Sequence, residues 1–113
     1  MRRGEVWLIN LDPTVGSEIK KTRPAVIVND DAIGILPLRV IVPITAWQER
    51  YAVAPWMVRL EPDLENGLDK PSAADAFQVR SVSQIRFVRR LGNVSAQALQ
   101  DITRALAIVL HIS

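Results

Sequence analysis

The sequence predicts a mostly β (α+β) protein, in which an antiparallel sheet or small barrel is followed by one C-terminal helix. Six short stretches of β-branched, aromatic and aliphatic residues follow one another with no helical segment between them, which disfavours alternating βαβ units. Helical periodicity is confined to the C-terminal segment. The 113 residues, 49% of them hydrophobic and 23% charged, are typical of one folded domain, so we expect a single domain over residues 1–113.

The first three strands are expected where apolar runs are bounded by turn-forming residues, over Glu5–Leu11, Pro24–Asn29 and Leu38–Ile44. Asp12-Pro13 ends the first run, because proline lacks the N–H that a strand partner needs. Pro43 lies inside the third run, and we therefore expect it at a sheet edge, a bulge or a strand end. By the same reasoning, three further strands are expected over Trp56–Leu60, Ala74–Val79 and Arg86–Leu91.

The C-terminal helix is expected over Ala96–Ile112, with Ser95 as its N-cap, because this segment is rich in Ala and Leu and free of Gly and Pro. Helical spacing predicts a core-facing stripe made of Leu99, Ile102, Leu106, Val109 and Leu110. Ile108 and Ile112 widen the apolar surface beyond what one packed face needs. Either a homodimer contact or a deep groove in the same subunit would explain that surplus.

Composition excludes several classes of enzyme. The chain has no cysteine, which excludes disulfides, a thiolate nucleophile and cysteine-based metal sites. Its one histidine, His111, excludes a multi-histidine metal site, and its helical position predicts a surface residue. No P-loop or GxGxxG fingerprint occurs. We therefore expect neither a metal nor a cofactor.

The charge balance allows a polyanionic partner without requiring one. The net charge is +2, and 11 of the 14 cationic residues are arginine, the better residue for binding phosphate and stacking on bases. Arg86, Arg89 and Arg90 fit either a phosphate track or a solvated sheet edge. No segment is apolar and long enough to span a membrane, and Val6–Ile9 is too short for a signal sequence, so we expect a cytoplasmic protein.

The long loop before the second strand contains the first candidate site. Ser17 follows a glycine that lets the backbone approach a ligand closely, and Lys20, Lys21 and Arg23 create local positive potential. Arg23 lies at the start of a strand, which is a more rigid support than a loop. Thr45 ends the third strand and can present its hydroxyl group at the sheet rim. From the residues alone, a solvated loop remains an open interpretation of the first segment, and a capping or turn role is the usual one for such a threonine.

Four segments occur along the chain in a fixed order and spacing: RGEVWLINLDPTVGSE, KTRPAVIV, VPIT, and AFQVRSV followed by RLG and a terminal helix. Together they resemble the MazF/PemK family of toxin endoribonucleases. The resemblance extends from Arg3 to Ile112. It implies an SH3-like antiparallel β-barrel with a C-terminal helix, of the CcdB/PemK toxin type, and a homodimer. It also implies a metal-independent, sequence-selective endoribonuclease that cleaves single-stranded RNA and is restrained by a cognate antitoxin protein.

The resemblance implies residue roles. Arg23 and Thr45 match catalytic positions, Ser17 and Glu18 match loop residues that contact RNA, and Gln78 matches a glutamine that contacts a nucleotide. Lys20 and Lys21 complete the expected RNA-binding set. In such a reaction the 2′-hydroxyl of the RNA is the nucleophile, and the products carry a 2′,3′-cyclic phosphate and a 5′-hydroxyl. Arg23 would neutralise the phosphate with its guanidinium, and Thr45 would donate a further hydrogen bond to it.

The general base is left open by the sequence. Arginine is a poor base because its guanidinium group holds its proton very strongly. Glu18 is the nearest carboxylate along the chain, although an ion pair with a lysine or an arginine is the more expected role for it. Phe77 stands where many relatives have an acidic residue; we expect it in the core, with stacking on a base as the alternative. Asp75 would share its face on a strand and could substitute for the missing acid.

The tryptophans divide by context. Trp7 and Trp56 fall in expected strands and are expected in the core, whereas Trp47 follows Thr45 and fits either RNA stacking or a dimer contact. Two alternative functions remain open at this point. One is a non-enzymatic toxin of the same fold that poisons DNA gyrase, and the other is a catalytically inactive SH3-like binding module.

Overall fold

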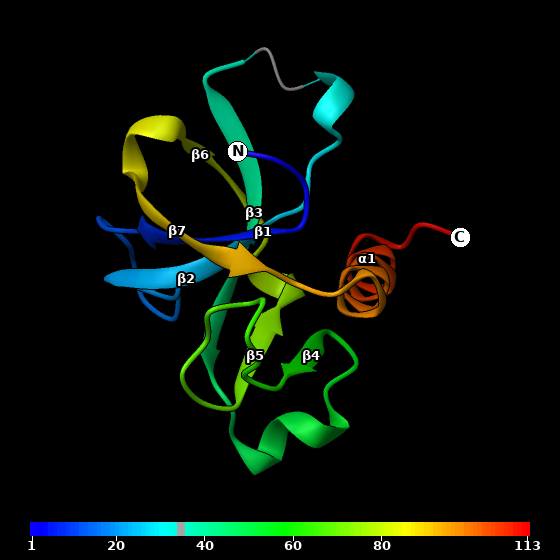
Figure 1. The fold of residues 1–113 in the computed structure, drawn as a ribbon. Coiled ribbons are helices and arrows are strands. Elements are labelled where there is room, and N and C mark those ends of the chain that lie inside the picture. Colours follow the sequence, from blue (N-terminus) through cyan, green and yellow to red (C-terminus); the bar gives the residue numbers. More distant parts are fainter. Residues whose placement is uncertain (34–35) are drawn as a thin grey trace.

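A computed structural model describes residues 1–33 and 36–113. Seven antiparallel strands form one strongly bent sheet, and a single α-helix, α1, packs beside it (Figure 1). The strands are β1 Glu5–Asn10, β2 Thr22–Ile27, β3 Leu38–Ala46, β4 Met57–Leu60, β5 Ser72–Asp75, β6 Arg80–Ser83 and β7 Phe87–Asn93, and the helix is α1 Ala96–Leu110. Four short 3-10 helices connect them: η1 Asp31–Ile33, η2 Glu49–Val53, η3 Ala76–Gln78 and η4 Gln84–Arg86.

The strand order is β4-β5-β3-β2-β1-β7, with β6 also paired to β3. The predicted mostly β architecture with a C-terminal helix is therefore confirmed. Within the described residues no ladder joins β7 to β4, so the sheet is bent but not closed, and the term barrel fits it only loosely.

Strand β3 organises the sheet because three strands pair with it. Ile41 through Pro43 pair with β2, residues 38–41 pair with β6, and residues 44–46 pair with β5. The expectation that Pro43 lies at an edge, a bulge or a strand end is wrong, since it is fully buried inside β3. It lies between the β6 and β5 ladders, where the missing N–H interrupts neither.

Because successive side chains of a strand point to opposite faces of the sheet, the apolar residues form two cores. On one face Val6, Val26, Val42 and Ile44 pack with Ile102 of α1. On the other face six buried residues form a second cluster: Ile9, Leu11, Ala25, Ile27, Ile41 and Val82. Trp7 packs against this second cluster, as expected for a tryptophan in a strand, and its ring meets Phe87 edge to face at 5.4 Å between centroids.

The expected strand over Ala74–Val79 is wrong. Strand β5 ends at Asp75, whose carboxylate accepts a hydrogen bond from the backbone N–H of Phe77 at 3.1 Å and caps η3. Strand β6 follows immediately, and its four residues are too few for a clear alternating pattern. Asp75 and Phe77 therefore do not share one face of a strand.

Helix α1 confirms the predicted N-cap, because Ser95 Oγ accepts a hydrogen bond from the N–H of Ala98 at 3.1 Å. Ile102 is fully buried, and Leu99 and Leu106 pack against the first core. The prediction that Leu110 belongs to the core-facing stripe is wrong, since this residue, at the end of α1, is 55% exposed. Ile108 and Ile112 are also exposed, so a groove in the same subunit does not cover them. No helix in the described chain is long and apolar enough to cross a membrane.

Candidate functional site

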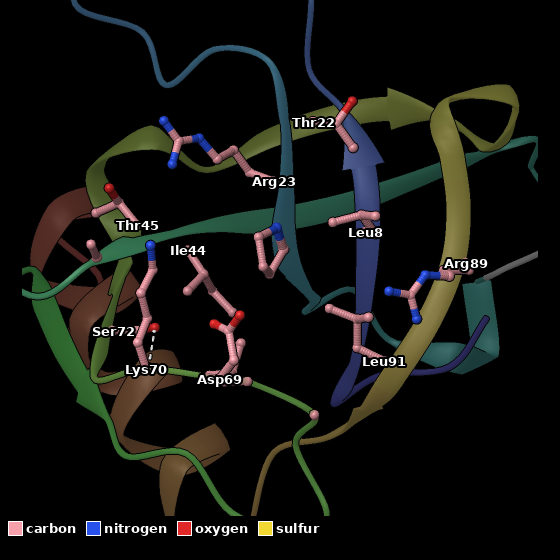
Figure 2. A pocket seen from close by; sticks show the side chains of 14 residues that line it. Leu8, Thr22, Arg23, Ile44, Thr45, Asp69, Lys70, Ser72, Arg89 and Leu91 are labelled. Atoms are coloured by element: carbon pink, nitrogen blue, oxygen red, sulfur yellow. Dashed lines mark hydrogen bonds between the residues drawn. The ribbon is translucent and has the colours of Figure 1, made fainter.

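Arg23 and Thr45 lie on one face of adjacent strands. The β2–β3 ladder pairs Val26 with Val42 and Ala25 with Pro43. The ladder ends at that second pair. Arg23 and Thr45 lie two residues further along their strands, on the face that Ala25 and Pro43 share, and both line one pocket. Figure 2 shows the Arg23 side chain extending toward Thr45 above the strand. The two predicted catalytic residues, far apart in sequence, are therefore brought together.

A pocket of about 280 Å³ opens beside this pair (Figure 2). Arg23 is partly buried, and its Nε donates to the backbone oxygen of Lys20 at 3.3 Å. Within the described chain its two terminal nitrogens make no hydrogen bond, so they remain available for an anion. Lys70 and Arg89 line the same pocket and add positive charge to it.

The sequence did not single out Lys70, because its position depends on a tertiary contact. Gly67 has a φ of +69°, and a Cβ there would lie 2.2 Å from the backbone oxygen of Leu91 on β7. Glycine alone lets the 61–71 loop approach this strand so closely. The loop then carries Asp69 and Lys70 to the pocket, where Figure 2 shows Lys70 extending toward Thr45.

The β1–β2 loop is the second part of the site. Ser17, Glu18, Lys20 and Lys21 are all exposed, as the RNA-binding expectation requires. The expected ion pair of Glu18 is wrong, since no salt bridge among the described residues involves it. Its Oε1 instead accepts a hydrogen bond from the N–H of Val15 at 2.6 Å, which stabilises the turn of the loop.

Gln78 attaches this loop to η3. Its Nε2 donates to the backbone oxygen of Ser17 at 3.2 Å, and its Oε1 accepts from the N–H of Ile19 at 2.6 Å. Both functions of the amide group therefore hold the loop backbone. A residue expected to contact a nucleotide thus also fixes the position of the loop beside Thr45.

Two further pockets adjoin the first. One, of about 460 Å³, is lined by Ser17, Thr45, Trp56, Asp75 and Gln78, among others. The other, of about 540 Å³, shares Ser17 and Gln78 with it. Thr45 is shared by the first two pockets, and Ser17 and Gln78 are shared by the last two.

Asp75 is the buried carboxylate of this surface, with 5% of its area exposed. Burial raises the pKa of Asp75, and hydrogen bonds from Phe77 and Gln78 only partly oppose that rise. Its position depends on the end of β5 at η3, which the sequence patterns did not reveal.

The aromatic residues differ from expectation. Phe77 and Trp56 are wrongly predicted as core: Phe77 is 65% exposed, and its ring meets that of Trp56 edge to face at 6.0 Å between centroids. Trp47 packs within the chain, with the Arg59 guanidinium 4.7 Å from its ring centroid. Phe77 and Trp56 therefore present an exposed aromatic pair at the rim of the two larger pockets.

No group of three or more His, Asp or Glu side chains that could hold a metal ion occurs in residues 1–33 and 36–113. The charged side chains around the pockets are mainly cationic, with Arg23, Lys70 and Arg89 in the first pocket and Arg50 and Arg80 in the others. The site is therefore suited to an anionic, extended ligand.

Comparison with known protein families identifies the class to which this fold and site belong. Residues 2–110 match the family described as PemK-like, MazF-like toxin of type II toxin-antitoxin system. The chain belongs to this family of toxins.

Relatives of known name match over almost the whole chain. Endoribonuclease MazF9 of Mycobacterium tuberculosis is 36% identical, covering 99% of this chain and 98% of its own. Endoribonuclease PemK of Escherichia coli is 31% identical, covering 97% of this chain and 82% of its own. The crystal structure of MazF from Deinococcus radiodurans superposes with a TM-score of 0.83 at 24% identity, over 99% of this chain and 97% of that one, which shows the shared fold.

Proposed function

We propose that this toxin is a metal-independent endoribonuclease that cleaves single-stranded RNA at short sequences. The observation that carries the proposal is that Arg23 and Thr45, on adjacent strands, line one pocket together with the cationic Lys70 and Arg89. The relatives named endoribonuclease, with 36% and 31% identity over nearly the full chain, support the same activity.

The reaction needs no nucleophile from the protein. The 2′-hydroxyl of the RNA attacks the adjacent phosphorus, and the products carry a 2′,3′-cyclic phosphate and a 5′-hydroxyl. The protein has to hold the 2′ oxygen in line and neutralise the charge that develops on the phosphate. Arg23 supplies a planar pair of N–H donors for the non-bridging oxygens, and Thr45 supplies a hydroxyl donor to the same phosphate.

The remaining predicted residues bind the strand on either side of that phosphate. Ser17, Glu18, Lys20 and Lys21 contact the RNA from the β1–β2 loop, and the two lysines attract its backbone. Gln78 contacts a nucleotide in the pockets that it lines, in addition to holding the loop. Single-stranded RNA fits this surface better than a duplex, because unstacked bases can enter the pockets.

Residues 1–113 act as a single domain in the cytoplasm, as a homodimer that a cognate antitoxin restrains. Solved structures of the same fold support the last point, because one is an endoribonuclease in complex with its cognate antitoxin from a Mycobacterial species and another is the MazE-MazF complex of Deinococcus radiodurans. The exposed Ile108 and Ile112 support an apolar contact between two copies.

The test is incubation of the purified protein with a long single-stranded RNA in EDTA, followed by mapping of the cut ends. We expect discrete cuts at one short motif with 5′-hydroxyl ends. Arg23→Ala should lower the cleavage rate by at least about 10³-fold while leaving the circular dichroism spectrum unchanged. Arg104→Ala, which alters an exposed arginine on α1, is the matched control and should cleave at the native rate.

Two results would contradict the proposal. Intact RNA with inhibited DNA gyrase would favour the gyrase-poisoning toxin, and intact RNA without gyrase inhibition would favour the binding module. A native rate in the Arg23→Ala variant would refute the assignment of the site even if RNA is cut.

A further inference from the structure

Asp75 differs from the other carboxylates around the pockets. Glu18 and Asp69 line them as exposed side chains, whereas Asp75 is 5% exposed and reaches solvent through the pocket that it shares with Thr45. Capping η3 does not require a carboxylate, since an asparagine could cap it equally well. The acidic group of Asp75, in a recess beside the expected phosphate position, therefore has no evident structural reason.

The sheet register places Asp75 next to Thr45. The β3–β5 ladder pairs Thr45 with Ala73, and Asp75 follows two residues later on the same face. Thr45 and Asp75 are therefore diagonal neighbours, with Cα atoms about 7–8 Å apart. Arg23 lies on β2, on the other side of β3 from β5, so Thr45 shares one pocket with Arg23 and a second pocket with Asp75.

The local structure fixes the orientation of this carboxylate. Its Oδ1 accepts the N–H of Phe77 at 3.1 Å, which holds the side chain at the point where β5 turns into η3. Gln78 follows in η3 and lies close enough to act as a further hydrogen-bond donor to Asp75. The carboxylate is thus held by rigid backbone rather than by a mobile loop, as a catalytic group requires.

We propose that Asp75 is the general base that accepts the proton of the 2′-hydroxyl group. This inference rests on the proposed ribonuclease function. The 2′ oxygen, once its proton passes to the carboxylate, forms a bond to phosphorus, and the bond from phosphorus to the 5′ oxygen breaks. The 5′ oxygen leaves with the electron pair and takes a proton from a water molecule. Asp75 returns its proton to the resulting hydroxide, so no proton is gained or lost overall.

The other candidates for this role fit less well. Glu18 is exposed and lines neither of the two pockets that contain Thr45. His111 caps the far end of α1 at a φ of +57° and is not among the residues that line the three pockets. Arg23 carries a guanidinium group, which has no acceptor lone pair for a proton and is suited to binding the phosphate.

The proposal predicts how the rate depends on pH. Four ionisable groups lie near Asp75. Arg50 and Tyr51 line the pocket that Asp75 shares with Thr45. Arg59 lies on β4, on the same face of the sheet as Asp75, and Glu18 lies on the loop that Gln78 holds. Only an ionised Asp75 can take the proton, and burial raises its pKa above the ordinary value of 3.8. The rate should therefore rise with pH above that value and then reach a plateau.

Asp75→Asn is the decisive variant, because it keeps the size of the side chain and the acceptor for the Phe77 N–H. The measurement is single-turnover cleavage of a short RNA containing one cut site, from pH 4 to pH 8, with thermal unfolding to confirm the fold. We expect a loss of about 10²-fold or more at the plateau and disappearance of the acidic limb. Asp101→Asn on exposed α1 is the matched control and should keep both the rate and the limb.

The wild-type profile provides a test that does not depend on any variant. A rate independent of pH from 4 to 7 would overturn the proposal, as would an Asp75→Asn variant that keeps the acidic limb. If the wild-type protein cuts no RNA, the proposed function itself fails. If the wild type cuts RNA and Asp75→Asn matches it, only the role of Asp75 fails.

Discussion

Thr45 illustrates how single atoms define this site. Its backbone pairs with Ala73, while its side chain lines two adjoining pockets opposite Arg23. The hydroxyl group is the only part of this side chain that can donate to a phosphate oxygen. Its contribution to the reaction is therefore separable from its contribution to the sheet.

Thr45→Val tests this separation, since valine keeps the branched shape that suits a strand and removes only the hydroxyl donor. We expect the single-turnover rate to fall by about 10²-fold with little change in stability, because one donor to the developing charge is lost. Thr45→Ser should recover most of the rate. Thr103→Val on α1 serves as the control and should cleave normally; equal rates for the Thr45→Val variant and the wild type would contradict the role of the hydroxyl.

At the scale of residues, the sequence predicted the positions that local context defines. Arg23 begins an apolar run and Thr45 ends one, so local context makes both candidates, and the resemblance to the toxin family implies their roles. Lys70 could not be selected in this way, because its position depends on the contact of Gly67 with β7. Asp75 was considered as a substitute acid only on the wrong expectation of a strand over 74–79, because its position depends on the end of β5. The prediction for Phe77 is wrong because apolar character indicates burial only when the residue remains in a strand.

At the scale of elements, the link between η3 and the β1–β2 loop has a mechanical role. Gln78 holds the loop by two hydrogen bonds that span 61 and 59 residues of sequence. The loop carries Ser17 and Glu18, so its position relative to β3 depends on one side chain. Loss of this link should spread the loop over several positions and weaken its contacts with RNA.

Gln78→Ala should lower kcat/KM by about tenfold to a hundredfold, mainly through KM, because the loop loses its fixed position. Hydrogen exchange at the backbone N–H of Ile19 should become faster. This would not occur if Gln78 only contacted a nucleotide and did not hold the loop. Gln97→Ala, which removes an exposed glutamine on α1, is the control and should change neither quantity. Unchanged exchange at Ile19 would contradict the positioning role.

The long elements were predictable and the short ones were not. The predicted helix N-cap at Ser95 and five of the six expected strands are present with shifts of a few residues at their ends. The sixth, expected over Ala74–Val79, is replaced by the end of β5 and η3, and β6 and η4 follow in a segment where no element was predicted before residue 86. Hydrogen bonds from Asp75 and Ser83 cap those short helices, and periodicity does not report such bonds.

At the scale of the whole molecule, Glu5 ties the N-terminal strand to the rest of the sheet. Its side chain accepts hydrogen bonds from Trp7 Nε1 at 2.9 Å and from the N–H of Arg2 at 3.0 Å. Burial acts to raise the pKa of Glu5, but these bonds and the charges of the N-terminus and Arg90 together lower it. Because the folded protein favours the ionised form, Glu5 stabilises the fold above its ordinary pKa of 4.5 and loses this effect as pH falls below it.

Glu5→Gln should therefore lower the free energy of unfolding by about 1–2 kcal/mol at pH 7 and by much less at pH 3. Urea denaturation at the two pH values measures the difference. Glu61→Gln, which breaks an exposed pair with Arg59, should cost under about 1 kcal/mol at pH 7. A loss that is equal at pH 3 and pH 7 would show that the charge of Glu5 does not stabilise the fold.

The pairing of β3 with three strands limits how the length of this chain can change. Inserting or deleting one residue in β3 would exchange its two faces, so Ile44 would leave the first core and the side chain of Thr45 would turn toward it. Compensation would require matching changes in β2, β5 and β6 at once. Natural length variation among such toxins should therefore accumulate in segments such as residues 28–37 and 61–71, while β3 tolerates new side chains but keeps a fixed number of residues.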